Sequence, residues 1–179
     1  MAADVGRPWV LLVLLAALLP GLARAELTQV SASGITVRHT FQLAAAPDAA
    51  WQVLVHPERW WPSGHTWSGD AAHLSLDPEA GGCFCERWSG GSAEHGRIVQ
   101  ARPGQLLRFT GALGPLQEMA VSAVLSVTLT PQGGGTQAVV TYRVSGDASH
   151  AFEALAPIVD KVIGQQFGGF AALAGRPAP

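Results

Sequence analysis

Three polar side chains interrupt otherwise apolar patterns, and their types suit hydrogen bonding or proton transfer. His39 and Tyr142 each lie between two apolar residues on one face of an expected strand, and Gln166 lies within the apolar stripe of an expected C-terminal helix. A buried polar group requires a partner or a ligand. The simpler interpretation is that His39 and Tyr142 satisfy each other or nearby backbone groups. The alternative is a polar anchor for a ligand, or an acid–base pair acting at a carbonyl, which suits an imidazole with an ordinary pKa of ~6.5.

A second candidate pair, Glu86 and His95, flanks a glycine-rich turn and shares an alternating face with Phe84 and Trp88. With the turn centred on Gly90-Gly91, the two residues face each other across a hairpin. If this face points outward, they form a surface ion pair worth ~0–1 kcal/mol. If it points inward, they form a carboxylate–imidazole dyad with perturbed pKa values in an apolar cleft. The opposite face is an equally good candidate for burial, but we favour the inward orientation because two aromatic residues share the face of Glu86.

The remaining histidines and tryptophans of this region are interpreted as structural. Four histidines fall at expected turns and are assigned to solvent or to capping: His56, His65, His73 and His150. Three tryptophans are expected to pack at the mouth of a cavity: Trp60, Trp61 and Trp67. The predicted ligand-binding set consists of the two candidate groups above with Phe84, which shares the face of Glu86, and Trp67 at the cavity mouth: His39, Tyr142, Gln166, Phe84, Glu86, His95 and Trp67. No catalytic residue is assigned.

Cys83 and Cys85 are the two cysteines of the chain. At positions i and i+2 of a strand they point to the same face. They would lie ~6–7 Å apart by strand rise, whereas a disulfide needs Cβ atoms about 4 Å apart. The spacing therefore favours two small thiols, with a strained disulfide or an intermolecular bridge as the alternative. A metal site is disfavoured, because no C-x-x-C or H-x-x-x-H spacing accompanies the pair.

Alternating polarity delimits the strands that must carry these residues. A period of two over 34–43 marks a half-buried strand. Two further alternating segments, 122–130 and 138–144, flank a Pro-Gln-Gly-Gly-Gly turn and indicate an antiparallel hairpin. Shorter strands are expected at 74–76, 83–88, 94–101 and 105–111.

Two helices are expected beside this sheet. The first begins at Pro47, a favourable residue in a first turn, and ends at Pro57. The second has apolar residues at a period of 3.6 over about 157–174, with Gly164 and Gly168 on the opposite face. Because the apolar face of the sheet must be covered, this second helix has to lie on it. The predicted fold class is α+β, with a curved antiparallel sheet of six to seven strands wrapped around a long C-terminal helix.

The first 25 residues have the composition of a secretory signal peptide. Arg7 precedes an apolar run that a Pro-Gly pair ends, and small residues follow at the positions that a signal peptidase reads. The run is shorter than the about 20 residues of a membrane-spanning helix. We therefore expect cleavage between Ala25 and Glu26, and a single domain over 26–179 in an extracytoplasmic compartment, either periplasmic or secreted.

Charge and motif content exclude several classes of partner. The chain carries a net charge of −2, and removal of one acidic and two basic residues with the leader shifts it to −3. It has no run of lysines or arginines, which argues against nucleic acid and anionic membranes as partners. No metal-ligand spacing, nucleotide-binding glycine loop or catalytic triad is recognised, so no cofactor is predicted.

Several short motifs follow one another between Gly34 and about Gly175. They are Ala-Pro-Asp-Ala-Ala-Trp51, His-Pro-Glu-Arg-Trp-Trp-Pro62, Gly81-Gly-Cys-Phe84, Gly96-Arg-Ile-Val-Gln-Ala-Arg-Pro103 with Leu106-Leu-Arg-Phe109, and the final helix. In this order and spacing they resemble the SRPBCC (START-like, helix-grip) superfamily. The branch that they resemble includes polyketide cyclases and relatives of the heat-shock chaperone ATPase activator. The resemblance implies that the first and last strands are neighbours, which would bring His39 and Tyr142 close together.

Members of this superfamily include lipid and hormone carriers, aromatase/cyclases, oxygenase domains and chaperone activators, so the resemblance does not decide the function. An exported chain would not meet a cytosolic chaperone. The leading hypothesis is an exported binding protein for a small hydrophobic or amphipathic molecule, held between sheet and C-terminal helix. One alternative is a cyclase or dehydratase that uses a cavity His, Tyr or Glu as acid or base. The other is a partner-binding module with no ligand.

Overall fold

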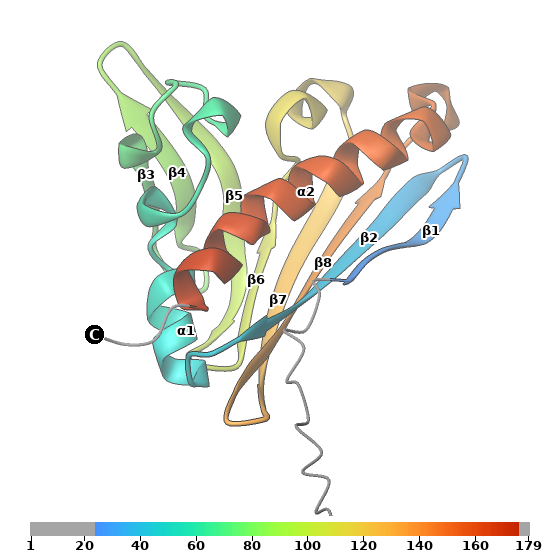
Figure 1. The fold of residues 1–179 in the computed structure, drawn as a ribbon. Helices are drawn as coiled ribbons and strands as arrows, with labels where there is room; N and C mark the ends of the chain where they lie inside the picture. Colours follow the sequence, from blue (N-terminus) through green and yellow to red (C-terminus); the bar gives the residue numbers. More distant parts are fainter. Residues whose placement is uncertain (1–23, 176–179) are drawn as a thin grey trace, which may run out of the picture.

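An antiparallel sheet and one long helix form the body of the protein (Figure 1). The computed structural model describes residues 24–175. The strands are β1 (Arg24–Ser31), β2 (Gly34–Leu43), β3 (Leu74–Leu76), β4 (Cys83–Trp88), β5 (Gly91–Arg102), β6 (Leu106–Thr110), β7 (Ser122–Gln132) and β8 (Gly135–Ser145). The helices are α1 (Pro47–Leu54) and α2 (Phe152–Ala174), and the short 3₁₀ segments are η1 (Pro57–Arg59), η2 (Ser63–His65), η3 (Ala71–His73), η4 (Gly114–Met119) and η5 (Ala148–His150).

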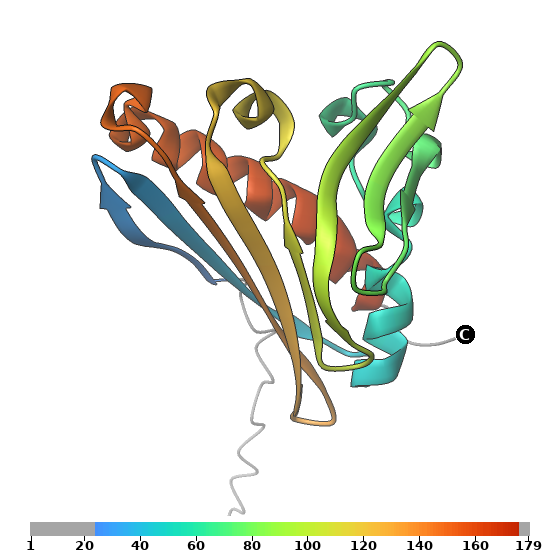
Figure 2. The same cartoon turned by 180° about the vertical axis from the view of Figure 1, so that it is seen from behind.

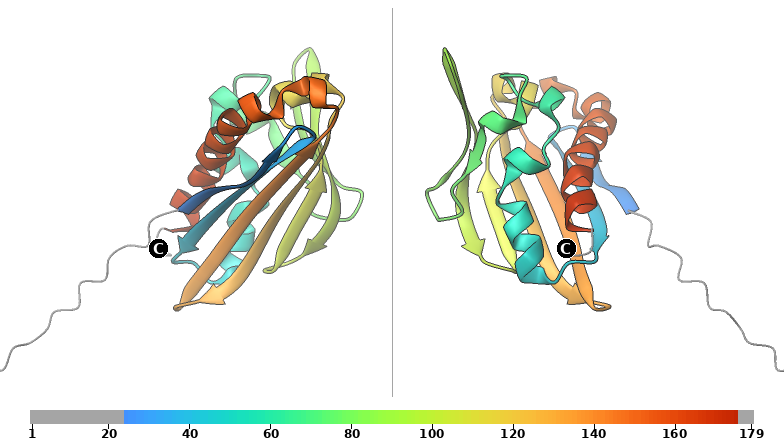
Figure 3. Two further views of the ribbon diagram at one scale, coloured as in Figure 1. Left: turned by 90° about the vertical axis from the view of Figure 1, so that its right-hand side faces the viewer. Right: turned by 60° about the vertical axis from the view of Figure 1, so that its left-hand side comes forward.

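The sheet is built almost wholly from sequential hairpins. Its strand order is β1-β2-β8-β7-β6-β5-β4-β3, and β2–β8 is the pairing that joins strands far apart in sequence. The helix α2 crosses one face of the curved sheet, while the other face carries no helix of the described chain (Figures 1 and 2). The side views show α1 beside the C-terminal end of α2 (Figure 3). The core and any pocket therefore lie between the concave face of the sheet and α2.

The segment after α1 is held on α2 by aromatic packing. The Trp60 ring lies 5.4 Å from the Phe167 ring and 5.7 Å from the Phe170 ring, measured between centroids. Gly169 makes this contact possible, because a Cβ atom there would lie 2.2 Å from the Trp60 carbonyl oxygen. The loop that follows Trp61 is thereby placed at the edge of the groove between sheet and helix.

The predicted fold class is confirmed, with eight strands instead of six to seven. The additional strand is β1, which pairs with β2 at the edge of the sheet and whose register shifts between Leu27 and Gln29. This irregularity shortens the alternating pattern on which the strand predictions rest. The predicted signal peptide lies outside the described residues except for its last two positions, Arg24 and Ala25, which begin β1. Within the described chain, no helix combines the length and the apolar character needed to span a membrane.

The C-terminal helix begins five residues before its predicted start. Phe152 and Ala156, in its first turns, are both buried in the core. Pro157 lies inside the helix and removes one backbone hydrogen bond near its start. Burial of a phenylalanine side chain contributes about 1.5–3 kcal/mol, which offsets that loss. The proline therefore does not mark the helix boundary.

Candidate functional site

A pocket of about 270 Å³ lies between the loop after Trp61, β5, the segment that leads into η4, and α2. Its lining residues are Trp61, Gly64, His65, Thr66, Trp67, His95, Leu113, Gly114, Pro115, Val162 and Gln166. Most of these side chains are apolar or aromatic, and three offer nitrogen or amide groups: His65, His95 and Gln166. No lysine, arginine or carboxylate is among the described residues that line the pocket.

Behind this pocket, the Glu86 carboxylate of β4 is fully buried and bound by three donors. The Trp67 backbone N–H donates to Oε2 at 3.0 Å, the Ser68 backbone N–H donates to Oε1 at 2.5 Å, and His95 Nε2 donates to Oε2 at 2.9 Å. Burial alone would raise the pKa of Glu86, but hydrogen bonds from Ser68, Trp67 and His95 together hold that pKa below its ordinary value. Glu86 is therefore ionised at neutral pH. Its hydrogen bonds to Trp67 and Ser68 hold in place the loop that lines one side of the pocket.

The imidazole of His95 lines the pocket and connects it to Glu86. Burial lowers the pKa of His95, and the neighbouring Glu86 only partly opposes this effect, so the ring is neutral at neutral pH. An ionised carboxylate can only accept hydrogen bonds, which places the ring proton on Nε2. Nδ1 is then a bare acceptor, and it has no hydrogen-bond partner within residues 24–175. The pair can hold a hydrogen-bond donor or take up a proton at Nδ1.

A β-bulge in the β4–β5 hairpin turns His95 toward this pocket. Phe84 pairs with Gly96 and Cys85 pairs with Glu94, which leaves His95 as an extra residue on β5. Such a residue re-aims its side chain relative to the regular alternation. His95 and Gly96 are consequently both buried although they are adjacent. The bulge is what allows the imidazole to lie beside Glu86.

The predicted hairpin register is therefore wrong, although the predicted contact between Glu86 and His95 is present. Glu86 pairs with Ala93, and the turn lies at Ser89-Gly90 because Trp88 pairs with Gly91. The side chain of Glu86 points inward, as in the favoured interpretation, and meets the bulged imidazole diagonally. The predicted register assumed a regular hairpin with its turn centred on Gly90-Gly91, whereas the observed hairpin has a tighter turn and one extra residue on β5.

Two other polar groups in the pocket lack partners. The Gln166 side-chain oxygen and His65 Nδ1 are both buried without a hydrogen bond in the described part of the chain. Gln166 is held in place because it lies in the middle of α2 and is only 4% exposed. His65 ends η2, and its backbone carbonyl accepts a hydrogen bond from Trp61 Nε1 at 3.1 Å. An unsatisfied buried polar group costs about 1–3 kcal/mol, which a ligand that bonds it would recover.

His39 and Tyr142 lie on adjacent strands, as the resemblance implied, but they bind different partners. His39 Nε2 lies 2.9 Å from Asp160 Oδ1 and 3.2 Å from the Asp160 carbonyl oxygen on α2. The Tyr142 hydroxyl donates to the Gly111 carbonyl at 3.2 Å and accepts from the Leu113 N–H at 2.9 Å. Burial raises the pKa of Tyr142 well above its ordinary value. Both residues are thus engaged in holding elements together, and neither lines the pocket that contains His95.

The other predicted residues occupy supporting positions. Phe84 packs against the His95 ring, with centroids 4.9 Å apart, and so helps to hold the imidazole in place. Trp67 lines the pocket at its edge and is 46% exposed. Tyr142 lines a second, apolar pocket of about 130 Å³, which shares Leu113, Pro115 and Val162 with the first. A ligand longer than the first pocket can extend in this direction.

Sequence reasoning missed His65 as a pocket residue and assigned it to a solvated turn. It ends a single 3₁₀ turn that follows Pro62 and contains Gly64, where neither strand nor helix periodicity applies. The loop that carries His65 is bound at Trp67 and Ser68 by the carboxylate of Glu86, which is distant in sequence. The composition of the loop contains no signal of that contact.

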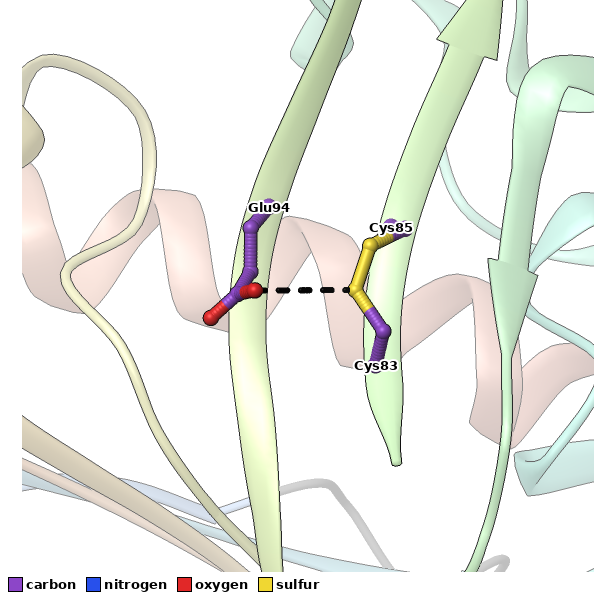
Figure 4. A group of neighbouring side chains, drawn as sticks. All are labelled: Cys83, Cys85 and Glu94. Atoms are coloured by element: carbon purple, nitrogen blue, oxygen red, sulfur yellow. Dashed lines mark hydrogen bonds between the residues drawn. A yellow bond between two sulfur atoms is a disulfide. The ribbon is translucent and has the colours of Figure 1, made fainter. Parts of the chain in front are cut away.

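The prediction that the two cysteines are free thiols is also wrong. Cys83 and Cys85 are joined by a disulfide on the face of the sheet away from α2 (Figure 4). Their Cα atoms are 5.4 Å apart, which is closer than in a regular strand and within the range of about 4.4–6.8 Å for disulfides. The β5 bulge lies opposite this part of the strand, between the partners of Phe84 and Cys85. Glu94 Oε2 lies 3.9 Å from Cys83 Sγ and is paired with Arg97. Because both sulfur atoms are bonded to each other, this cluster offers no thiolate to a metal.

Comparisons with known proteins agree with this architecture. A solved structure from Chromobacterium violaceum is 20% identical with a TM-score of 0.56, over 79% of this chain and 98% of that chain. One from Mesorhizobium loti is 22% identical with a TM-score of 0.53, over 80% and 99% of the two chains. The di-domain ARO/CYC protein StfQ from the steffimycin biosynthetic pathway is 13% identical with a TM-score of 0.53, over 80% of this chain and 51% of that chain. These likenesses show a shared fold.

A search of curated proteins finds no significant match. Residues 34–175, which include every strand but β1 and the whole of α2, match the family described as polyketide cyclase/dehydrase and lipid transport. The match spans most of the chain and includes the residues that form both pockets. The chain therefore belongs to the polyketide cyclase/dehydrase and lipid transport family, within the SRPBCC helix-grip proteins.

Proposed function

We propose that the protein binds a small, largely apolar molecule with one polar group in the pocket of about 270 Å³ beneath α2. The observation that carries this proposal is the presence of two buried polar atoms without partners, Gln166 Oε1 and His65 Nδ1, in an otherwise apolar pocket. A module that bound only a protein partner would gain nothing from an open cavity with unsatisfied groups. The lipid-transport activity in the family description supports the same proposal.

The dimensions of the site limit the ligand. Ligand pockets commonly measure about 300–1,000 Å³, so this one suits a molecule with one or two rings or a short chain. The adjoining apolar pocket of about 130 Å³ can receive a further alkyl or ring substituent. The polar end of the ligand would lie toward His95 and Gln166, and the apolar end toward the residues shared by the two pockets.

The test combines a search for a retained molecule with a variant that fills the pocket. Native mass spectrometry of the protein from its own host should detect a bound small molecule, and titration with an apolar fluorophore should quench the tryptophans at the pocket. Val162→Trp fills the cavity and should abolish both signals, whereas Gln165→Trp, on the exposed side of the same helix, should leave them unchanged. Equal binding by both variants would show that the ligand does not use this pocket.

A second candidate function, acid–base catalysis, is favoured by the Glu86–His95 pair. A neutral imidazole, oriented by a buried carboxylate, with a bare nitrogen toward a pocket is an arrangement suited to a general base. Cyclisation and dehydration both begin with removal of a proton next to a carbonyl. If this function holds, a supplied β-diketone should be converted, and Glu86→Gln should lower kcat more than it raises KM. Retention of the diketone without conversion would exclude catalysis on this class of substrate.

We also propose that the protein acts in a periplasmic or secreted location after cleavage between Ala25 and Glu26. The leader composition supports this, and so does the Cys83–Cys85 disulfide, because such bonds persist mainly in oxidising compartments. N-terminal sequencing of the protein from its host should find Glu26 as the first residue. Detection of Met1 or Ala2 would contradict export by this route.

A further inference from the structure

We infer that the polar group held against His95 is a hydroxyl, so that the pocket selects neutral hydroxyl-bearing molecules over carboxylates and ketones of the same skeleton. This inference rests on the proposed binding function and names the chemical class of the ligand. Three observations support it: the ring proton of His95 is bound to Glu86, several polar groups of the pocket have no partner in the described chain, and the Glu86 carboxylate is the nearest charge.

The proton on His95 is committed to Glu86. The carboxylate accepts from Nε2 at 2.9 Å and also from the backbone N–H groups of Trp67 and Ser68, so it has no proton to give back. His95 therefore presents Nδ1 as an acceptor. Only a ligand group that donates a hydrogen bond can satisfy this atom. A carbonyl oxygen would place one lone pair against another.

Gln166 and His65 supply the complementary part of the interaction. The amide of Gln166 carries both a donor and an acceptor and has no hydrogen-bond partner in residues 24–175, and His65 Nδ1 is likewise unpaired there. A hydroxyl donates one hydrogen bond and accepts others. It can therefore donate to His95 Nδ1 while it accepts from the Gln166 amide. The proton of a hydroxyl satisfies His95 Nδ1, and its oxygen accepts from the Gln166 side-chain N–H, whereas a ketone leaves His95 Nδ1 unsatisfied. The unpaired Gln166 oxygen then remains for a further donor of the ligand.

Charge disfavours an anionic ligand. The nearest ionised group behind the pocket is the Glu86 carboxylate, one imidazole ring away, and no lysine or arginine is among the described lining residues. A ligand carboxylate would lose its hydration, face a like charge and find no cation to compensate. The described lining of the pocket thus lacks the lysine or arginine expected of a site for a fatty acid or another carboxylate.

The experiment uses four probes with one skeleton: naphthalene, 2-naphthol, 2-acetonaphthone and 2-naphthoate. Binding to the purified protein is measured at pH 7.5 by quenching of tryptophan fluorescence and by calorimetry. We expect 2-naphthol to bind about tenfold more tightly than naphthalene, which corresponds to ~1.4 kcal/mol for the added hydrogen bonds. The ketone should bind no better than naphthalene, and the carboxylate should bind at least tenfold more weakly than the naphthol.

Variants assign this preference to His95. His95→Phe removes the acceptor and keeps a ring beside Phe84, so it should lose the preference for 2-naphthol while naphthalene binding persists, which also shows that the pocket is intact. His56→Phe changes an exposed histidine outside the pocket and should behave as the wild type. Gln166→Leu should reduce the preference by a smaller factor.

The outcomes separate the two proposals. If 2-naphthoate or the ketone binds as tightly as 2-naphthol, the pocket is a binding site but the hydroxyl assignment is wrong. If His95→Phe retains the full preference, the assignment to His95 is wrong. If none of the four probes binds, the proposed binding function fails, and the inference about the ligand falls with it.

Discussion

Gly164 of α2 lies directly against the ring of His39 on β2, so closely that a Cβ atom at position 164 would be 2.8 Å from His39 Cε1. The imidazole is fixed there by its contact with Asp160, one helical turn earlier. The sequence placed Gly164 on the helical face away from the core, where it had no evident packing role. In the structure it is the point at which the helix approaches the sheet.

Gly164→Ala should therefore destabilise the protein although alanine favours helix. Overpacking costs typically 1–3 kcal/mol, and the gain in helix propensity returns about 1 kcal/mol of it. We expect a net loss of up to ~2 kcal/mol in urea unfolding, the difference between these two effects. Gly168→Ala is the matched control, because a Cβ there meets no atom within 4 Å, and it should raise stability by up to about 1 kcal/mol. Equal effects of the two changes would contradict the close approach.

The Glu86–His95 pair predicts a stability that falls with acidification in two stages. Both groups have pKa values below their ordinary ones of 4.5 and 6.5, so the unfolded chain binds more protons than the folded one. Stability is then fully present above about pH 7. It declines as pH falls below 6.5 because His95 resists protonation, and again below 4.5 because of Glu86. The slope for one proton is at most ~1.4 kcal/mol per pH unit.

Urea unfolding between pH 4 and pH 8 measures this dependence. His95→Phe should remove the upper stage, whereas the same change at the exposed His56 should retain it. A wild type and a His95→Phe variant with parallel pH profiles would show that the imidazole is not held neutral by its surroundings.

The disulfide should contribute only modestly to stability. The Cys83–Cys85 bond closes a very short loop, for which chain-entropy reasoning gives about 1–2 kcal/mol. We expect the Cys83→Ser/Cys85→Ser double variant to fold and to lose no more than this in urea unfolding. Alkylation of the unfolded wild type should modify neither cysteine until a reductant is added. Modification without reductant would show free thiols.

Gln166→Leu should leave the free protein as stable as the wild type or up to about 1–3 kcal/mol more stable. The reason is that leucine continues the apolar stripe and removes a buried oxygen that has no partner in the described chain. The same variant should bind 2-naphthol more weakly, which melts with and without this probe would reveal. A loss of stability with unchanged affinity would assign Gln166 to the scaffold.

The extent of successful prediction follows the regularity of the backbone. The strict alternation of β2 and the 3.6-residue period of α2 allowed the sheet, its covering helix and the inward position of Gln166 to be predicted. The same rules fail where regularity ends. The bulge at His95, the loop at His65 and the contracted spacing of the cysteines each depart from a regular period, so neither alternation nor a helical repeat indicates them. The site is made largely of such exceptions.

The single extra residue at His95 also separates two frames within β5. From residue 91 to His95, the odd-numbered residues point inward. After His95, at Gly96 and Ile98, the even-numbered residues point inward. Substitutions that retune the imidazole and its loop therefore need not disturb the alternation that builds the lower core. Such a division separates the half of the strand that shapes the site from the half that only the core requires, so one scaffold can change its ligand without a change in its core.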